Sequence, residues 1–255
     1  MILEIDVGNT RLKWRWLDAD GEVVVRGAEA YNGVEWSVLW SAIAVSAVPS
    51  DVRIVNVSSP EVSKRLYESC YLTWQLRPRF AKVESECAGV INGYDEPLRL
   101  GVDRWLVLLA AYALYPAKPC VVIDCGSAVT VDVLAKNGQH LGGYIVPGAN
   151  LMRKSLFADT TAVKVSDLAL SCVTNPGTST DQAVSHGVIL MITGLCREVV
   201  NNLCCKQGWL RDEINLLITG GDGEVVRSAI DMDIEYWEDL VFDGLSLCSF
   251  ETSDK

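Results

Sequence analysis

One short turn motif occurs twice in this chain, and the repeat constrains the fold more than any other feature. IDVGNT (residues 5–10) follows an apolar run, and IDCGSA (residues 123–128) follows another. Each copy precedes a second apolar stretch, so each predicts a strand, a tight turn and a second strand. The glycine lets backbone N–H groups approach an anion, and the aspartate can hold a cation that bridges to phosphate. Two such loops facing each other across a cleft are expected to bind a nucleoside triphosphate.

The hydrophobic pattern around the two loops alternates between strands and helices. Predicted strands cover a hairpin at Met1–Asp18, then Val23–Arg26, Arg53–Val57, 120–124, 128–134, 140–146 and Ile214–Thr219. Predicted helices cover Val34–Val45, Glu61–Cys70, Asp103–Tyr115, Thr180–Cys204 and Glu224–Ile230, while Leu240–Cys248 fits a helix or a strand. The repeated order predicts an α/β fold of two duplicated domains, residues 1–117 and 118–255, with a boundary near 116–119.

Charge and cysteine usage narrow the functional class. A net charge of -11 without a basic cluster disfavours nucleic acid as a partner. The nine cysteines include no Cys-x-x-Cys pair, and Glu4 and Asp6 interrupt the first apolar run, so we expect reduced thiols and no secretory leader. The longest uninterrupted apolar run, Trp105–Ala117, is too short to span a bilayer. The expected protein is therefore cytoplasmic, with neither a nucleic-acid nor a membrane partner.

A third glycine-rich element, ITGGDG (residues 218–223), follows a predicted strand and precedes a helix. That position suits a nucleoside at a helix N-terminus, although a structural turn explains it equally well. The chain contains neither a P-loop nor a Gly-x-Gly-x-x-Gly motif. Two Asp-x-Gly loops with a late Thr-Gly-Gly resemble the superfamily of acetate and sugar kinases, heat-shock ATPases and actin. This resemblance implies two RNase H-like domains with an interdomain cleft.

A longer signature resembles one family within that group. NGYDEPLRLGVDRW (residues 92–105) is similar to the substrate signature of the type III pantothenate kinases, and the similarity continues through GGYIVPG (142–148) and STDQA (179–183). The resemblance implies ATP-dependent phosphorylation of pantothenate to 4'-phosphopantothenate, the first step of coenzyme A biosynthesis. It also implies Mg2+ with ATP, a monovalent cation such as potassium or ammonium, and a homodimer.

The resemblance also assigns site residues. The nucleotide would contact Asp6, Val7, Gly8, Asn9, Thr10, Arg11, Leu12, Lys13 and Ser127. Asp124 would hold the monovalent cation and Asp6 the Mg2+. Pantothenate would contact Tyr94, Gly101, Val102, Asp103, Arg104 and Thr180, with Asp103 as the proton acceptor. Ser127 stands where the family commonly has threonine, and serine keeps the hydroxyl.

Several of these residues also have plain structural explanations. Asp103 suits the N-cap of a helix beginning at Arg104, and Arg104 is either a solvated charge or a forked donor for a carboxylate or phosphate. Tyr94 could be a packed aromatic residue, and His140 and His186 are expected to be structural. The open alternatives for function are a sugar kinase, a polyphosphate-splitting phosphatase, or a regulatory role, since a member of this family was first described as an accessory factor for transcription.

Overall fold

The computed structural model describes residues 1–31, 33–43, 48–158 and 170–252. The chain divides into two compact units. The first comprises Met1–Ala88, Tyr94–Ala110 and Val241–Lys255, and the second comprises Gly89–Gly93 and Ala111–Leu240. These units differ from the predicted ranges because the C-terminal segment belongs to the first unit, while residues 89–93 and 111–117 belong to the second. The assignment of two domains to 1–117 and 118–255 stays a prediction.

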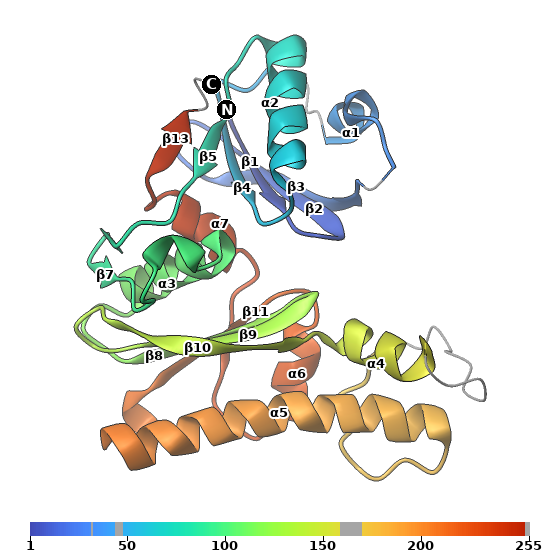
Figure 1. Ribbon diagram of the computed structural model, residues 1–255, viewed down its shortest axis with the longest axis vertical. Coiled ribbons are helices and arrows are strands. Elements are labelled where there is room, and N and C mark those ends of the chain that lie inside the picture. Colours follow the sequence, from blue (N-terminus) through green and yellow to red (C-terminus); the bar gives the residue numbers. More distant parts are fainter. Residues whose placement is uncertain (32, 44–47, 159–169, 253–255) are drawn as a thin grey trace. The chain divides into compact units, whose positions relative to one another are not determined.

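The first unit is built on a six-stranded sheet, shown at the top of Figure 1. Its strands are β1 (Ile2–Val7), β2 (Arg11–Leu17), β3 (Val23–Ala30), β4 (Asp51–Asn56), β5 (Arg79–Ala81) and β13 (Phe250–Thr252). Their order is β13-β5-β4-β1-β2-β3, with β1 antiparallel to β2 and parallel to β4. The predicted hairpin and the strands after it are confirmed. The pairing of β13 with β5 carries the end of the chain onto the first sheet.

Alternation along β1 decides which face of this sheet is the core. Leu3, Ile5 and Val7 are fully buried in one apolar cluster, and Glu4 points to the opposite face because successive strand residues alternate. The cluster is shared with α1 (Trp36–Ile43) and α2 (Pro60–Trp74). The first unit also contains the 3-10 helix Pro97–Arg99. Two further helices belong to it in part: α3 (Val102–Leu114) up to Ala110, and α7 (Leu240–Leu245) from Val241 on. Predicted helix 34–45 ends in residues outside the described part of the chain.

The second unit repeats the strand order of the first. Its sheet contains β8 (Cys120–Cys125), β9 (Ala128–Leu134), β10 (His140–Pro147), β11 (Asn215–Thr219) and β12 (Glu235–Tyr236). The order β10-β9-β8-β11-β12 corresponds to β3-β2-β1-β4-β5, with the same parallel and antiparallel pairings. A separate pair, β6 (Glu86–Cys87) and β7 (Val90–Ile91), precedes the substrate signature. The expected α/β fold with a duplicated arrangement is therefore confirmed.

Helices of the second unit are α4 (Ala149–Ala158), α5 (Thr180–Gln207) and α6 (Gly223–Ala229), with a 3-10 helix at Arg211–Glu213. Among the described residues, α5 alone is long and apolar enough to cross a membrane, judged by length and composition only. Val188, Ile189, Ile192 and Cys196 of α5 pack in the core of this unit, as a core helix of a globular domain would. Polar residues interrupt the apolar ones along α5, so it contains no long uninterrupted apolar run. α4 was not predicted.

Candidate functional site

The β1–β2 hairpin presents the first predicted phosphate loop. The Gly8 N–H donates to the Arg11 carbonyl at 3.1 Å, which closes the turn, and Asn9 and Thr10 are exposed at its tip. Asp6 pairs with Lys13 in register, and both are half-buried. The neighbouring Val7 and Leu12 are fully buried. These two predicted nucleotide contacts can therefore come only from the backbone, since both side chains lie in the core.

The substrate signature brings three predicted residues together in the first unit. The Arg104 guanidinium lies 5.3 Å from the centre of the Tyr94 ring and also donates to the Tyr94 hydroxyl. The Asp103 carboxylate accepts from the Arg104 N–H at 2.8 Å. A Cβ on Gly101 would lie 2.6 Å from Asp103 Oδ1, so glycine leaves the room that this carboxylate occupies. Arg104 and Tyr94 thus flank the start of α3 together with an aspartate.

Two of the plain structural explanations are wrong. α3 begins at Val102, so Asp103 lies in the first helical turn and is not its N-cap. The Trp105 N–H donates to the Gly101 carbonyl at 2.9 Å, which starts the helix before Asp103. Arg104 is only 5% exposed and is therefore not a solvated charge. A buried guanidinium requires anionic or aromatic neighbours, and Tyr94 supplies one of them.

The β8–β9 hairpin of the second unit presents the second predicted loop. The Gly126 N–H donates to the Ala128 carbonyl at 3.0 Å, and Ser127 is exposed at the tip. Asp124 is half-buried at the end of β8 and pairs in register with Thr130. The Gly148 N–H donates to the Ser127 carbonyl at 3.0 Å, so the residue before α4 packs on this turn. The turn is therefore held by the hairpin itself and by the segment that leads into α4.

The third glycine-rich element packs directly on the second loop. Gly220 has a φ of +90°, and a Cβ there would lie 2.4 Å from Asp124 Oδ1 and 2.6 Å from the Cys125 carbonyl oxygen. The Asp222 N–H donates to that carbonyl at 3.0 Å. Glycine at 220 is required both for the backbone conformation and for the close approach. The juxtaposition of residues 218–223 with Asp124 supports a shared site over an isolated structural turn.

Asp222 and Arg153 are two charged residues of this region that the sequence analysis did not single out. Burial raises the pKa of the Asp222 carboxyl, and the nearby Arg153 guanidinium opposes that rise. Arg153 lies on α4 and is 7% exposed. An acidic residue among three glycines was a weak signal for Asp222. The sequence around Arg153 gave no sign of this role, because only the packing of α4 brings Arg153 near Asp222.

Thr180 and the histidines complete the predicted set. Thr180 is the first residue of α5 and is exposed, after an N-cap at Ser179 whose hydroxyl accepts from the Gln182 N–H at 3.3 Å. His140 is buried, with Nε2 3.0 Å from Asp132 Oδ1. His140 is therefore a core histidine of the second unit.

Cation binding would have to rely on few protein ligands. Among the described residues, no group of three or more histidine, cysteine, aspartate or glutamate side chains could hold a metal ion. Asp6 and Asp124 each place one carboxylate at the end of a strand, beside a turn of exposed backbone. Hard cations that take most of their ligands from phosphate oxygens and water fit such positions. The geometry therefore suits an ion that arrives with the nucleotide.

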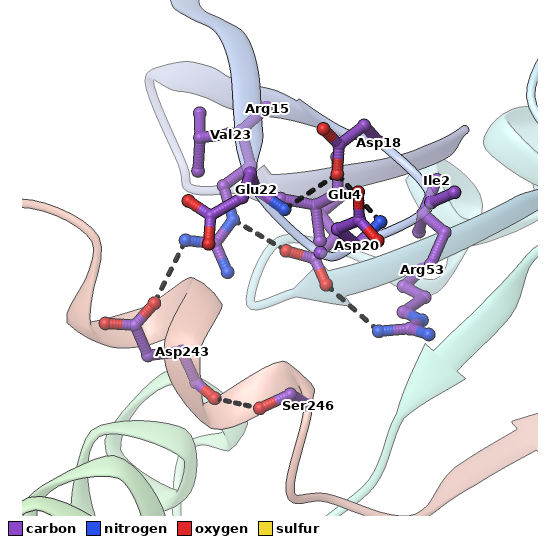
Figure 2. Close-up of a pocket in the computed structure, with 13 residues that line it drawn as sticks. Ile2, Glu4, Arg15, Asp18, Asp20, Glu22, Val23, Arg53, Asp243 and Ser246 are labelled. Atoms are coloured by element: carbon purple, nitrogen blue, oxygen red, sulfur yellow. Dashed lines mark hydrogen bonds and ion pairs between the residues drawn. The ribbon is translucent and has the colours of Figure 1, made fainter.

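A pocket of about 600 Å³ opens elsewhere on the first unit and is drawn in Figure 2. Glu4 is fully buried there, 2.7 Å from Arg15 Nε and 3.3 Å from Arg53 Nη1, and Arg15 Nη1 lies 3.0 Å from Asp243 of α7. Burial raises the pKa of Glu4 and outweighs the opposing effect of the two arginines. None of the predicted site residues lines this pocket. Its ion pairs connect α7 to the first sheet.

Comparison with known proteins assigns a family to this arrangement. A profile of the type III pantothenate kinase family matches residues 2–202. A type III pantothenate kinase from Chromohalobacter salexigens is 37% identical over 251 residues, which cover 97% of this chain and 87% of the relative. Two solved structures share the fold, and both alignments cover 96% of this chain. One is a candidate Baf family transcriptional activator from Campylobacter jejuni (21% identity, TM-score 0.58, 95% of that chain). The other is a candidate 2-dehydro-3-deoxygalactonokinase from Sinorhizobium meliloti (13% identity, TM-score 0.56, 97% of that chain).

Proposed function

Since the chain belongs to the type III pantothenate kinase family, we propose that it transfers the γ-phosphoryl group of ATP to the hydroxyl of pantothenate. The product would be 4'-phosphopantothenate, which enters coenzyme A biosynthesis. Support comes from a likeness that covers nearly the whole chain, and the family profile matches a range that spans residues 92–105. We further propose that the enzyme is a cytoplasmic homodimer that needs neither nucleic acid nor a membrane.

The observation that carries this proposal is the Tyr94–Asp103–Arg104 set at the start of α3. We assign Asp103 as the group that orients the pantothenate hydroxyl and accepts its proton. The transition state of phosphoryl transfer is loose, so little deprotonation is needed before attack and correct alignment matters most. The hydrogen bond from the Arg104 N–H holds the Asp103 carboxylate in place. Arg104 is assigned as the cationic donor for a carboxylate or phosphate, and Gly101, Val102 and Thr180 as further contacts to pantothenate.

The two hairpin loops are assigned to the nucleotide. Residues 6–13 would bind phosphate through backbone N–H groups and the side chains of Asn9, Thr10 and Lys13, and Ser127 would donate its hydroxyl to phosphate. Asp6 is the proposed ligand of Mg2+, and Asp124 that of a potassium or ammonium ion. When bound, these cations would neutralise charge on the phosphates. The half-buried carboxylates beside exposed turns support the assignment.

The proposal is tested by following ATP consumption with pantothenate in potassium and in sodium buffer. We expect turnover in potassium. The turnover rate of the Asp103→Asn variant should be lower by a factor on the order of 10²–10⁴, while the variant still binds ATP. Asp95→Asn is the matched control, because Asp95 is an exposed carboxylate of the same signature without an assigned role. It should retain full turnover.

Three results would contradict these assignments. Near-full turnover in Asp103→Asn would remove Asp103 from the reaction. ATP binding without pantothenate turnover in the unmodified chain would leave the fold in place and redirect the search to a panel of sugars and polyphosphates. Equal rates in potassium and sodium would remove the monovalent cation from Asp124.

A further inference from the structure

Tyr31 contacts the first phosphate loop from outside it. The residue follows β3 and is only 6% exposed, and its hydroxyl donates to the Gly8 carbonyl at 2.7 Å. The same oxygen lies 3.2 Å from Ser58 Oγ. A phenol has one hydrogen to donate, so the Ser58 hydroxyl supplies the hydrogen of the second bond. The Tyr31 hydroxyl is therefore satisfied as donor and acceptor while it holds the loop.

Ser58 is itself held by the turn between β4 and α2. Its N–H donates to Asn56 Oδ1 at 2.9 Å, and the Asn56 amide donates to Ser63 Oγ at 2.6 Å. The adjacent Val57 N–H donates to the Val7 carbonyl at 3.1 Å, which ties this turn to the end of β1. The loop is thus supported by the ends of both strands that flank the β1–β2 hairpin.

The Tyr31 ring is locked by a run of aromatic side chains. Its centre lies 5.8 Å from that of Trp36 at an interplanar angle of 22°, and Trp36 stands 5.8 Å from Trp40 at 30°. Trp40 in turn contacts Trp74 of α2 at 4.9 Å. Tyr31, Trp36 and Trp40 are buried in one core, so the ring cannot turn away without disturbing that packing. The hydroxyl position is consequently rigid.

The contact fixes a peptide that would otherwise turn easily. Residue 8 is a glycine, whose backbone has wide conformational freedom, so the peptide between Gly8 and Asn9 could adopt more than one orientation. In a planar trans peptide the carbonyl and the N–H point in opposite directions. A hydrogen bond that holds the Gly8 carbonyl toward Tyr31 therefore aims the Asn9 N–H to the other side.

We propose that Tyr31 is a positioning residue for nucleotide binding: by holding the Gly8 carbonyl, it keeps the Gly8–Asn9 peptide of the first phosphate loop in one orientation for binding the phosphates of ATP. The inference rests on the proposed role of residues 6–13. Tyr31 itself touches no reacting group. Its effect is to reduce the reorganisation that the loop would need when the triphosphate binds.

Tyr31→Phe tests this with a single lost hydroxyl, since phenylalanine keeps the aromatic packing. We expect the dissociation constant of Mg-ATP, measured by titration calorimetry without pantothenate, to rise about 3- to 10-fold, the worth of one hydrogen bond. The KM for pantothenate should stay unchanged. Tyr67→Phe is the control, because Tyr67 packs at the edge of the same core on α2. Its ATP affinity should equal that of the unmodified chain.

A purely structural role would give a different result. Unchanged ATP affinity in Tyr31→Phe, or a parallel loss of ATP and pantothenate affinity with a lower melting temperature, would overturn the proposal. Ser58→Ala should weaken ATP binding in the same direction, and the double variant should be no worse than Tyr31→Phe alone, because both act through one contact. Fully additive effects would also overturn it.

The calorimetric readout separates this inference from the proposed reaction. If the unmodified chain binds ATP but does not phosphorylate pantothenate, the proposed function fails, and the role of Tyr31 is still decided by the dissociation constants. If the unmodified chain does not bind ATP, both fail.

Discussion

Asp51 shows at the scale of one residue how opposing effects set a charge state in the first sheet. The carboxylate begins β4 and accepts hydrogen bonds from Arg79 Nε at 3.1 Å and Arg53 Nε at 3.0 Å. Burial by itself raises the pKa of Asp51, but the hydrogen bonds from Arg79 and Arg53 outweigh it and hold that pKa below its usual range. Arg79 also stacks 4.6 Å from the ring of Phe250 in β13. Asp51 therefore contributes to holding the C-terminal strand in place.

This balance predicts a pH-dependent stability. Asp51→Asn should lower the free energy of unfolding at pH 7 by about 1–2 kcal/mol, the worth of hydrogen bonds to a charged group that is partly exposed. Because the pKa of Asp51 is lower in the folded state, its ionised carboxylate stabilises the fold at pH values above the unfolded-state pKa. This stabilisation is lost as the pH falls through the folded-state pKa. The deficit of the variant should accordingly shrink below about pH 4. Urea unfolding at several pH values measures it, with the exposed Asp20→Asn as control. A deficit that does not change with pH would refute the explanation.

At the scale of elements, the start of α4 and the second loop meet backbone to backbone. A Cβ on Gly148 would lie 2.3 Å from the Gly126 carbonyl oxygen and 2.6 Å from that of Ser127. Neither backbone oxygen can move aside without shifting the turn. The start of α4 and the β8–β9 hairpin are thus packed rigidly together. The position of the hairpin loop depends on Gly148, which lies outside that loop.

We expect Gly148→Ala to displace this loop. The strain should cost about 1–3 kcal/mol of stability, and misplacement of Ser127 and Asp124 should reduce turnover on the order of 10- to 100-fold. Gly187→Ala in α5 is the control, because a Cβ there meets nothing within 4 Å and alanine favours a helix. Thermal unfolding and steady-state rates distinguish the two. Equal behaviour of both variants would show that the close contact is dispensable.

At the scale of the molecule, the family resemblance implies a homodimer, and the second unit offers an edge for it. β10 is an outer strand of its sheet and exposes Leu141, Tyr144 and Ile145, the last at 61%. Exposed apolar side chains on an edge strand favour association with another chain. We therefore expect the purified chain to be a dimer in solution.

Sedimentation equilibrium tests the association and its location together. Ile145→Lys should raise the dimer dissociation constant about 10-fold or more, because a charge would enter an apolar contact. Leu72→Lys on α2, where the side chain is 77% exposed, should leave it unchanged. A monomeric unmodified chain would contradict the dimer, and an unaffected Ile145→Lys dimer would place the contact elsewhere.

Much of this protein was readable from local sequence. The two Asp-x-Gly turns were recognised from a short motif that follows an apolar run, and residues 34–45 from apolar side chains at the helical period of about 3.6 residues. Neither signal needs a distant partner to recognise. The repeated order of elements then predicted a duplicated α/β fold. The signature at residues 92–105 identified the family, and with it the candidate residues on α3 and both hairpins.

Tertiary structure alone decided which of these elements meet. The pairing of β13 with β5, the packing of Gly148 on Gly126 and the contact of Tyr31 with the Gly8 carbonyl all join residues whose own neighbourhoods carry no sign of the contact. The physical reason is that periodicity records only which face of an element is apolar. Which distant backbone or side chain fills that face depends on the packing of the whole unit.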